Sequence, residues 1–414
     1  MTHRRVVVTG LGVVSPIGSG KEAFWAALLE GKSGIRSIQS FDASSFSCRI
    51  AGEVLDFRPE DYIPAAEIPK LSRTSQFAMA AAKMAIDDAQ IDFSGEERSR
   101  IGVVVGTGLG GMGIYETQLR RLFETNNPRR VHPWSIPLGM SNAAAAEIAI
   151  SYGLKGPNMT VSTACSSGSH AIGYGLDLIR MGKADLIVAG GTEACILPGV
   201  LAGFCSLRAL SMRNEAPDRA SRPFDKKRDG FAMGEGAGII VLEALERAKR
   251  RGANIYAEIL GYGATCEATH IVHPESTGRE EANVMELALQ DAGISPREVD
   301  YINTHGTSTV LNDSVETKAI KRIFGEHAYR ISLDSTKSMI GHTIGAAGAI
   351  EGMVCALTLQ RGVIHPTINY EEPDPECDLD YTPNRACERE VNVALSNSFG
   401  FGSNNSCLVM KAFS

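Results

Sequence analysis

The stretch GPNMTVSTACSSGSHAIGYGLDLIRMG, residues 156–182, contains the local pattern that decides the fold. Its β-branched residues predict a short strand over Thr160–Ser162, and the small residues after it predict a turn into a helix over Gly168–Met181. This strand–turn–helix unit puts Cys165 at the N-terminus of the helix. Because the helix dipole and free backbone N–H groups favour an anion there, we expect a nucleophilic thiol with a lowered pKa.

Short β-branched runs alternate with helix-like stretches along the rest of the chain. The further predicted strands are Arg5–Thr9, Ile101–Val105, Leu186–Ala189, Gly238–Leu242, Ile255–Gly261, Tyr301–Asn303 and Ala394–Asn397. The further predicted helices are Lys21–Leu29, Ser75–Ala89, Glu280–Ala292, Ser314–Phe324 and Ala346–Gln360. Continuous apolar strands separated by helices predict an α/β fold in which helices cover both faces of a parallel sheet.

The chain divides into two parts with similar patterns. The first ends near residue 250 with GIIVLEALERAKRRG, and the second restarts with the strand-like NIYAEILGYG. We therefore expect two similar α/β halves, residues 1–252 and residues 253–414, although this pattern alone does not establish a duplication. The stretches 213–222 and 365–381 are rich in proline and charge, so we expect surface loops there.

The composition limits the classes of protein to which the chain can belong. Of its 414 residues, 43% are hydrophobic and 21% are charged, which is typical of a soluble globular protein. The net charge of −7 gives no general basic surface for a nucleic acid, and no apolar run approaches the roughly 20 residues of a membrane span. Gly10, Gly12 and Pro16 interrupt the N-terminal apolar stretch, which favours a strand over a signal peptide. We expect a cytoplasmic protein.

The nine cysteines are spread from Cys48 to Cys407, and no pair has the CxxC spacing. An odd number of scattered cysteines predicts reduced thiols in a reducing compartment, with no zinc or other metal site. Apart from Cys165, we expect these cysteines to behave as small buried hydrophobic residues without a chemical role.

A literal GxGxxG runs from Gly106 to Gly111, between the predicted strand IGVVV and a helical pattern. A dinucleotide site would also need a second strand that ends in an acidic residue. The residues that follow, TNNPRRVHPWSIP, do not form a strand pattern. The motif therefore favours a glycine turn that packs against a neighbouring pocket.

Two histidines stand in similar surroundings. His305 lies in NTHGTST after a strand-like run, and His342 lies in KSMIGHTIG. Each is flanked by glycine and small hydroxyl residues, as expected where the backbone must let a ligand approach. A single histidine is usually structural, but two such loops in a chain with a cysteine at a helix N-terminus favour one shared site.

Six stretches along the chain carry a family resemblance: VVVTGLGVVSPIG, TACSSG, ASRPFDKKRDGFAMGEGAG, NTHGTST, STKSMIGHTIGAAGAIE and NSFGFG. The chain resembles the β-ketoacyl-[acyl-carrier-protein] synthases of the elongating, type II class. The family pattern G-x4-V-x2-A-C-S-S-G is met from Gly156 to Gly168. His342, where the initiating synthases carry asparagine, indicates the Cys-His-His class. The resemblance implies the thiolase fold, in which two similar α/β halves form α-β-α-β-α layers.

The resemblance implies decarboxylative Claisen condensation of an acyl thioester with malonyl carried on acyl carrier protein, in fatty-acid elongation. Cys165 would take the acyl group as a thioester. His305 and His342 would donate N–H hydrogen bonds to the malonyl thioester oxygen and stabilise the enolate left by CO2. Lys337 would orient the histidines, and Glu351 would be the carboxylate partner that a buried ammonium requires.

The family also implies roles for residues around these five. The backbone N–H groups of Cys165 and Phe401 would bind the oxyanion, and Gly400 and Gly402 would let Phe401 move as a gate. Thr307 and Thr309 match the hydroxyls that hold the phosphopantetheine arm. The acyl chain would meet Leu109, at the pocket floor, and Phe204.

Two positions near the gate depart from the family pattern. Ser403 replaces a glycine that usually follows GFG. In the stretch EATHIVHP the family usually has aspartate at Glu267 and threonine at Val272. The effect of these changes on gating is left open by the sequence.

The implied partner is an acidic acyl carrier protein, which needs a basic patch near the pocket mouth. The candidates are Lys70, Arg73, Arg129, Arg130 and Arg208, and Ala66 and Pro69 stand where the family often has basic residues. We expect a homodimer with no bound cofactor, since the substrate itself carries the phosphopantetheine on acyl carrier protein. The alternative is the ketosynthase subunit of a type II polyketide or polyene synthase, paired as a heterodimer with a chain-length factor. The acyl-chain length and the carrier protein are not determined by the sequence.

Overall fold

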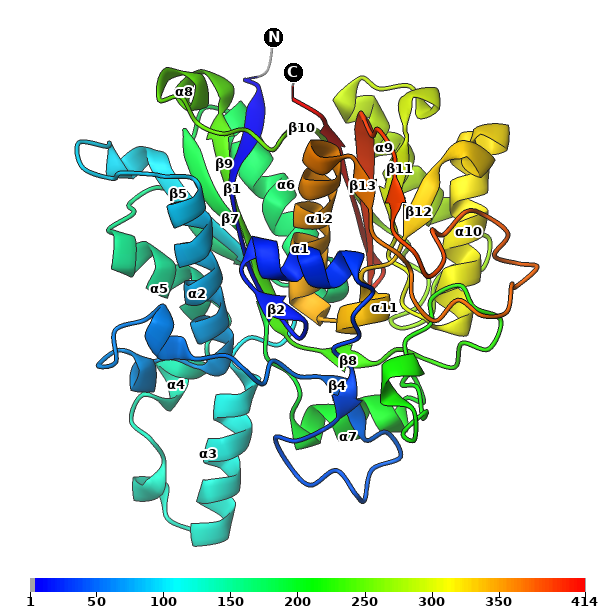
Figure 1. Ribbon diagram of the computed structural model, residues 1–414. Helices are drawn as coiled ribbons and strands as arrows, with labels where there is room; N and C mark the ends of the chain where they lie inside the picture. The colour runs from blue at the N-terminus through cyan, green and yellow to red at the C-terminus, as the bar shows by residue number, and fades with distance from the viewer. Residues whose placement is uncertain (1–3, 414) are drawn as a thin grey trace.

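A mixed sheet of eleven strands runs through the computed structural model, which describes residues 4–413 (Figure 1). The strands lie in the order β12-β11-β15-β16-β10-β1-β9-β7-β5-β6, and β2 pairs with β1. The first part of the chain contributes β1 (Val6–Ser15), β2 (Gly18–Ser19), β5 (Ile101–Gly106), β6 (Asn158–Val161), β7 (Leu186–Glu193) and β9 (Gly236–Ala244). The second part contributes β10 (Ala257–Cys266), β11 (Tyr301–Asn303), β12 (Ser332–Asp334), β15 (Val393–Gly400) and β16 (Asn404–Lys411).

The same strand order occurs twice in this sheet. The first set lies as β1-β9-β7-β5-β6, and the second set repeats that arrangement as β10-β16-β15-β11-β12. The two sets meet where β1 pairs antiparallel with β10 over three residues. The chain is therefore built from two similar α/β halves, while the boundary between residues 252 and 253 stays a prediction.

The sheet is mixed, so the expectation of a parallel sheet is wrong. Strands β5, β6 and β7 pair in parallel, as do β11, β12 and β15. Strands β1, β9, β10 and β16 pair antiparallel with their neighbours. A strand that is buried on both faces has the same apolar run in either direction, so the local pattern does not encode its orientation.

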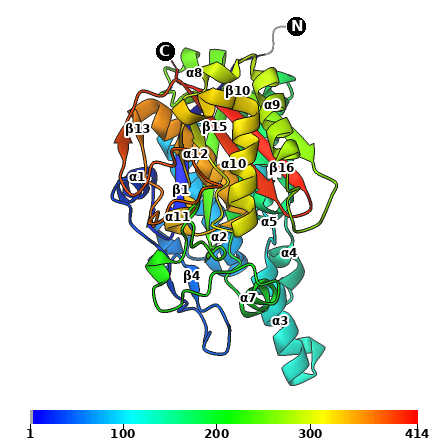
Figure 2. The same cartoon turned by 90° about the vertical axis from the view of Figure 1, so that its right-hand side faces the viewer.

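Helices separate and cover the two halves of the sheet, which gives five layers (Figures 1 and 2). Helices α6 (Ser167–Arg180) and α12 (Ala347–Arg361) pack on each other between the two strand sets. Helices α2 (Arg73–Asp88) and α5 (Ala143–Tyr152) cover the first set from outside, and α9 (Arg279–Ala292) and α10 (Val310–Phe324) flank the second set. Residues 347–359 of α12 are all buried, as expected of a helix that is surrounded by protein.

Further strands and α-helices lie outside these layers or at their margins. The small strands are β3 (Arg36–Ser37), β4 (Ile50–Gly52), β8 (Met233–Gly234), β13 (Val363–Ile364) and β14 (Cys387–Glu388). The other helices are α1 (Lys21–Leu29), α3 (Met112–Thr125), α4 (Ser135–Gly139), α7 (Pro198–Ser206), α8 (Leu245–Arg250) and α11 (Lys337–Ile340). Helices α3 and α7 extend below the layers in Figure 1. Within residues 4–413, no helix combines the length and the hydropathy that crossing a membrane requires.

Strand β1 continues well beyond its predicted end at Thr9. It passes through Gly10 and Gly12, which interrupt the apolar run in the sequence. A Cβ atom at Gly10 would lie 2.1 Å from the carbonyl oxygen of Ala85, and one at Gly12 would lie 2.0 Å from that of Ala81. The two glycines therefore let helix α2 pack directly on the strand, and they do not end it.

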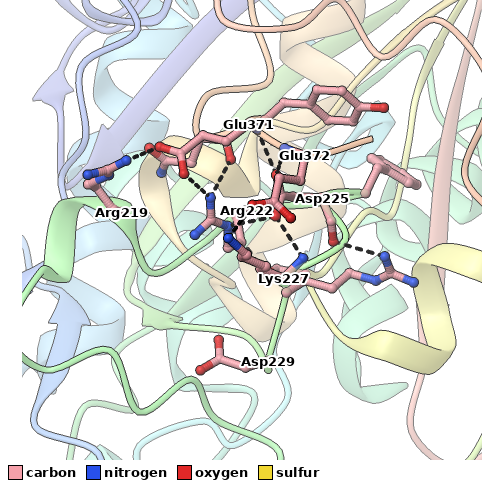
Figure 3. Close-up of polar contacts among 12 residues, drawn as sticks. Arg219, Arg222, Asp225, Lys227, Asp229, Glu371 and Glu372 are labelled. Atoms are coloured by element: carbon pink, nitrogen blue, oxygen red, sulfur yellow. Dashed lines mark hydrogen bonds and ion pairs between the residues drawn. The ribbon is translucent and has the colours of Figure 1, made fainter. Parts of the chain in front are cut away.

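The stretches 213–222 and 365–381 are not simple surface loops, because oppositely charged side chains join them (Figure 3). The side chain of Arg222 is only 2% exposed, and its guanidinium lies 3.1 Å from the carboxylate of Asp225 and 2.7 Å from that of Glu371. Arg222 and Glu371 belong to different halves of the chain, so the local content of proline and charge did not reveal their pairing.

Candidate active site

One cavity of about 410 Å³ is lined by residues from both halves of the chain. Cys165, His305 and His342 all lie on its wall. The exposed fractions of these residues are 6%, 3% and 3%. The structure thus brings together the three side chains that the sequence analysis expects to share a site.

Cys165 lies in a strained turn between strand β6 and helix α6. The turn is the short 3-10 helix η5 (Ala164–Ser166), and Ala164 has a φ of +50°, in the left-handed region. The hydroxyl of Ser167 accepts a hydrogen bond from the N–H of Thr163 at 2.9 Å and donates to the carbonyl of Ala164 at 2.6 Å. Ser167 therefore stabilises the turn that presents the sulfur of Cys165.

Burial dominates the electrostatics of Cys165 and raises the pKa of its thiol to about 11. The N–H groups of Phe401 and of Cys165 itself, together with the charge of Lys337, oppose this shift without cancelling it. The expected lowering of the pKa by the helix N-terminus is therefore wrong, because the position is deeply buried. At neutral pH the resting nucleophile is a thiol, and its proton must leave as the sulfur attacks.

The two imidazoles face each other edge to face, with ring centroids 5.4 Å apart and planes at 84°. Burial lowers the pKa of His305 and of His342 well below the usual 6.5, and the charge of Lys337 lowers both further. Both rings are therefore neutral at neutral pH. The Nδ1 atom of His342 accepts a hydrogen bond from the N–H of Ile344 at 3.3 Å, so the ring proton of His342 is on Nε2.

Lys337 and Glu351 form an ion pair behind the cavity wall. Their side chains come from α11 and α12, and each is 1% exposed. Burial raises the pKa of Glu351, and the ammonium of Lys337 opposes that shift. The pair matches the arrangement that the resemblance implies for these two residues.

The segment around Phe401 forms part of the cavity wall. Gly400 and Phe401 line the cavity, whereas Gly402 does not. A Cβ atom at Gly400 would lie 2.8 Å from the carbonyl oxygen of Thr163, and Gly402 has a φ of +81°. The ring of Phe401 lies 6.4 Å from the ring of Phe204, measured between centroids. The backbone here needs glycine on both sides of the aromatic residue.

This segment is tied by hydrogen bonds to residues 267–273. The N–H of Gly402 donates to the carbonyl of Ile271 at 2.8 Å, and the N–H of Glu267 donates to that of Ser403 at 3.0 Å. The hydroxyl of Ser403 adds a bond to the carbonyl of His270 at 3.0 Å, although Ser403 has a φ of +65°. A glycine at position 403 would remove both the strain and this bond.

The remaining expected substrate contacts also line the cavity: Leu109, Phe204, Thr307 and Thr309. The hydroxyls of Thr307 and Thr309 lie 2.9 Å apart. Leu109 belongs to the GxGxxG loop, and a Cβ atom at Gly106 in that loop would lie 2.3 Å from the backbone of Ser167. Gly106, at the end of β5, thus lets the start of this motif approach helix α6.

The structure adds residues that the sequence analysis does not single out. Phe231 and Phe399 lie on the cavity wall, with ring centroids 5.5 Å from His342 and 5.7 Å from His305. Buried Glu316 accepts a hydrogen bond from the N–H of His305 at 2.8 Å. A signal for Glu316 exists in the sequence, because it shares a helix face with apolar residues three and four positions later.

The five candidates for the basic patch lie in different surroundings. Arg208 lines the cavity, and it is exposed. Arg129 and Arg130 lie exposed on the short 3-10 helix η4 (Pro128–Arg130). Lys70 pairs with the exposed Glu67 of its own turn at 3.0 Å. The guanidinium of Arg73 donates to the buried carboxylate of Glu235 at 2.7 Å and to a backbone carbonyl, although the side chain itself stays 46% exposed.

Because the pKa of Cys165 is raised to about 11, its alkylation by iodoacetamide should accelerate about tenfold for each pH unit between roughly pH 7 and 9. The rate is measured by mass spectrometry of the peptide that contains Cys165, with the exposed Cys387 followed in the same samples as a reference. A rate that levels off near pH 7 would mean that the thiol is already ionised and would contradict the effect of burial.

Replacement of Ser403 by alanine or by glycine should increase amide hydrogen exchange in residues 267–273 and 400–403, because both changes remove the hydroxyl bond to His270. Glycine should cost less thermal stability than alanine, because it tolerates the positive φ. Ser206→Ala, which removes a bond within helix α7, is the control. Unchanged exchange in both Ser403 variants would mean that this bond does not hold the segment.

Comparison with known proteins gives matches over the whole chain. Curated relatives named 3-oxoacyl-[acyl-carrier-protein] synthase 2 include one from Synechocystis sp., 48% identical over 100% of this chain and 99% of the relative. Another, from Coxiella burnetii, is 47% identical over 99% of each chain.

Solved structures also match this chain over its whole length. A chain described as the "ishigamide ketosynthase/chain length factor" has a TM-score of 0.94 and 39% identity, with complete coverage of both chains. A chain from a complex of a type II PKS acyl-carrier protein with its ketosynthase bound to the hexaketide also has a TM-score of 0.94, with 38% identity and complete coverage.

Two family descriptions match successive parts of the chain. Residues 3–248 match "Beta-ketoacyl synthase, N-terminal domain", and residues 256–371 match "Beta-ketoacyl synthase, C-terminal domain". The first range contains Cys165, and the second contains His305 and His342. Because these two ranges cover most of the chain and the curated relatives are 47–48% identical over nearly all of it, the chain belongs to the β-ketoacyl synthase family.

Proposed function

We propose that this chain lengthens an acyl group by decarboxylative Claisen condensation in fatty-acid synthesis. The substrates are an acyl thioester and malonyl-acyl carrier protein, and the products are 3-oxoacyl-acyl carrier protein, CO2 and free carrier protein. The observation that carries the proposal is that one buried thiol and two neutral imidazoles line the same cavity. Curated relatives at 45–48% identity over essentially the full chain, all named 3-oxoacyl-[acyl-carrier-protein] synthase 2, support it.

The first step is acyl transfer to Cys165. The sulfur attacks the thioester carbonyl, and the bond to the carrier's sulfur breaks. The proton of the Cys165 thiol ends on the departing carrier thiol, so charge is balanced. The N–H groups of Cys165 and Phe401, which both act on the sulfur of Cys165 in the free protein, are the donors for the oxyanion.

The second step joins the two carbon chains. Malonyl loses CO2, and the electron pair of the broken C–C bond forms an enolate. Nε2–H of His342 donates to the enolate oxygen, and His305 supplies the second contact. The enolate carbon attacks the acyl thioester on Cys165, the C–S bond breaks, and the freed sulfur takes up a proton. The charge of Lys337, which Glu351 makes possible at this depth, adds to the effect of burial in lowering the pKa of both imidazoles.

The partner that we propose is an acidic acyl carrier protein, docked where Arg208 stands at the cavity. Thr307 and Thr309 then hold the phosphopantetheine arm, and Leu109 and Phe204 contact the acyl chain. Arg129 and Arg130 are exposed candidates without a carboxylate partner among the ion pairs of the described residues, whereas the charges of Lys70 and Arg73 are already paired with Glu67 and Glu235. A solved relative at 38% identity, described in complex with an acyl-carrier protein, supports this docking.

We propose further that the active form is a cytoplasmic homodimer. All nine cysteines are free, as suits a reducing compartment. Strand β6 is an end strand of the large sheet, and Met159 on it is 39% exposed. Helices α3 and α4 expose further large apolar side chains, including Phe123 and Ile136. A second copy of the chain would cover this edge and this apolar surface.

A second candidate function is the ketosynthase subunit of a type II polyketide synthase. It is favoured by the solved relatives at TM-score 0.94, whose descriptions name a type II PKS ketosynthase and a chain length factor. The departures at Ser403 and Val272 also keep it in view. The higher identity to the 3-oxoacyl-[acyl-carrier-protein] synthases, 45–48% against 38–39%, favours fatty-acid elongation.

The purified protein alone, incubated with malonyl-acyl carrier protein and acyl carrier proteins loaded with short, medium and long acyl groups, should form 3-oxoacyl products. Mass spectrometry identifies the products, and sedimentation should give twice the chain mass of 44.2 kDa. Cys165→Ala should abolish product formation, whereas Cys387→Ser, at an exposed cysteine, should not.

Two outcomes would contradict the proposal. Activity that appears only after addition of a chain-length-factor subunit would favour the polyketide function. Product formation that survives in Cys165→Ala would rule out the covalent mechanism altogether.

A further inference from the structure

Strand β7 ends in a buried carboxylate, Glu193, after the apolar run LIVAGGT. The residue is 0% exposed, and burial raises its pKa to about 7. It accepts hydrogen bonds from four neutral donors: Thr107 Oγ1 at 3.2 Å, the N–H of Gly108 at 2.7 Å, that of Leu109 at 3.2 Å and that of Gly345 at 3.0 Å. Among residues 4–413 no cation pairs with Glu193, so its four hydrogen bonds to neutral donors are what satisfy the buried acid.

The four donors belong to two different parts of the site. Thr107, Gly108 and Leu109 are in the glycine loop that lines the acyl end of the cavity. Gly345 follows His342 by three residues, in the turn that carries the imidazole. The carboxylate of Glu193 therefore joins the acyl-pocket loop to the turn of His342.

The turn that Glu193 holds is strained at Ile344. This residue has a φ of +46°, which is a genuine outlier for a β-branched side chain. Its N–H is the donor to Nδ1 of His342, and its side chain lies against Gly108, where a Cβ atom would come within 2.8 Å of it. Such strain persists only where the surroundings hold the backbone from several sides. Glu193 does so from both sides, through Gly108 and Gly345.

We propose that Glu193 is a positioning residue for the condensation step, which keeps the turn at Ile344 in place and thereby keeps the proton of His342 on Nε2. The proposal rests on the function proposed above. Without the carboxylate the turn relaxes toward negative φ, and the N–H of Ile344 leaves Nδ1. The ring proton then distributes over both nitrogens, and the donor to the enolate is lost in part of the molecules. Acyl transfer to Cys165 does not use this donor.

The test is Glu193→Gln, which keeps the size of the side chain but turns one acceptor oxygen into an NH2 group facing N–H donors. Single-turnover assays at pH 8 measure acylation of Cys165 with a short acyl group and, separately, condensation with malonyl-acyl carrier protein. Condensation should slow by about 10- to 100-fold, as expected for a displaced catalytic group. Acylation should hold or rise, because the charge of Glu193 raises the pKa of Cys165. The tautomer of His342, read from 15N chemical shifts and assigned with a His342→Asn sample, should become mixed.

The control is Glu243→Gln, at a buried carboxylate that is bound by Arg247, Arg251 and Thr9 and does not line the cavity. It reports the effect of losing a buried charge, measured by thermal unfolding, without displacing His342. Equal losses of acylation and condensation in Glu193→Gln, or an unchanged tautomer of His342, would overturn the proposal. The tautomer is measured without substrate, so a wild-type protein that fails to condense would contradict the proposed function while leaving the role of Glu193 testable.

Discussion

The burial of His305 and His342, reinforced by the charge of the buried Lys337, is the constraint on which the chemistry of the cavity depends. An unpaired ammonium at this depth would cost several kcal/mol, and the carboxylate of Glu351 makes its burial possible. Once paired, Lys337 still lowers the pKa of both imidazoles, in addition to the larger effect of burial. His305 and His342 are therefore neutral. A neutral imidazole still carries one N–H group that donates a hydrogen bond.

The fold brings these groups together through the ends of its strands. His305 follows β11, and Lys337 and His342 follow the parallel strand β12, so both loops leave the same edge of the sheet. Cys165 reaches that edge from the other half of the chain, after β6. The backbone of each histidine loop donates hydrogen bonds to a buried carboxylate. Glu316 accepts from the N–H groups of His305 and Gly306, and Glu193 accepts from that of Gly345. Fixed backbone geometry, rather than side-chain flexibility, sets the spacing of the site.

Features encoded in short stretches could be predicted from the sequence. Helix α1 begins and ends where its pattern predicts, and the glycine- and hydroxyl-rich loops identified Cys165, His305 and His342 as one group. Strand direction could not be predicted, since a buried strand has the same composition in either orientation.

Features that depend on distant parts of the chain were missed or misjudged. The pKa of Cys165 depends on how deeply the tertiary structure buries it, which a local argument from a helix N-terminus cannot include. The ion pair of Arg222 with Glu371 joins positions 149 residues apart. Glu193 did leave a signal, an acid at the end of an apolar strand, but its partners lie in loops far along the chain.

The most direct test of the central claim is an NMR titration of the imidazole nitrogens of His305 and His342 in the intact protein. Both rings should stay neutral from pH 8 down to pH values well below the ordinary histidine pKa of about 6.5. A ring at either position that takes up a proton at or above about pH 6.5 would contradict that claim.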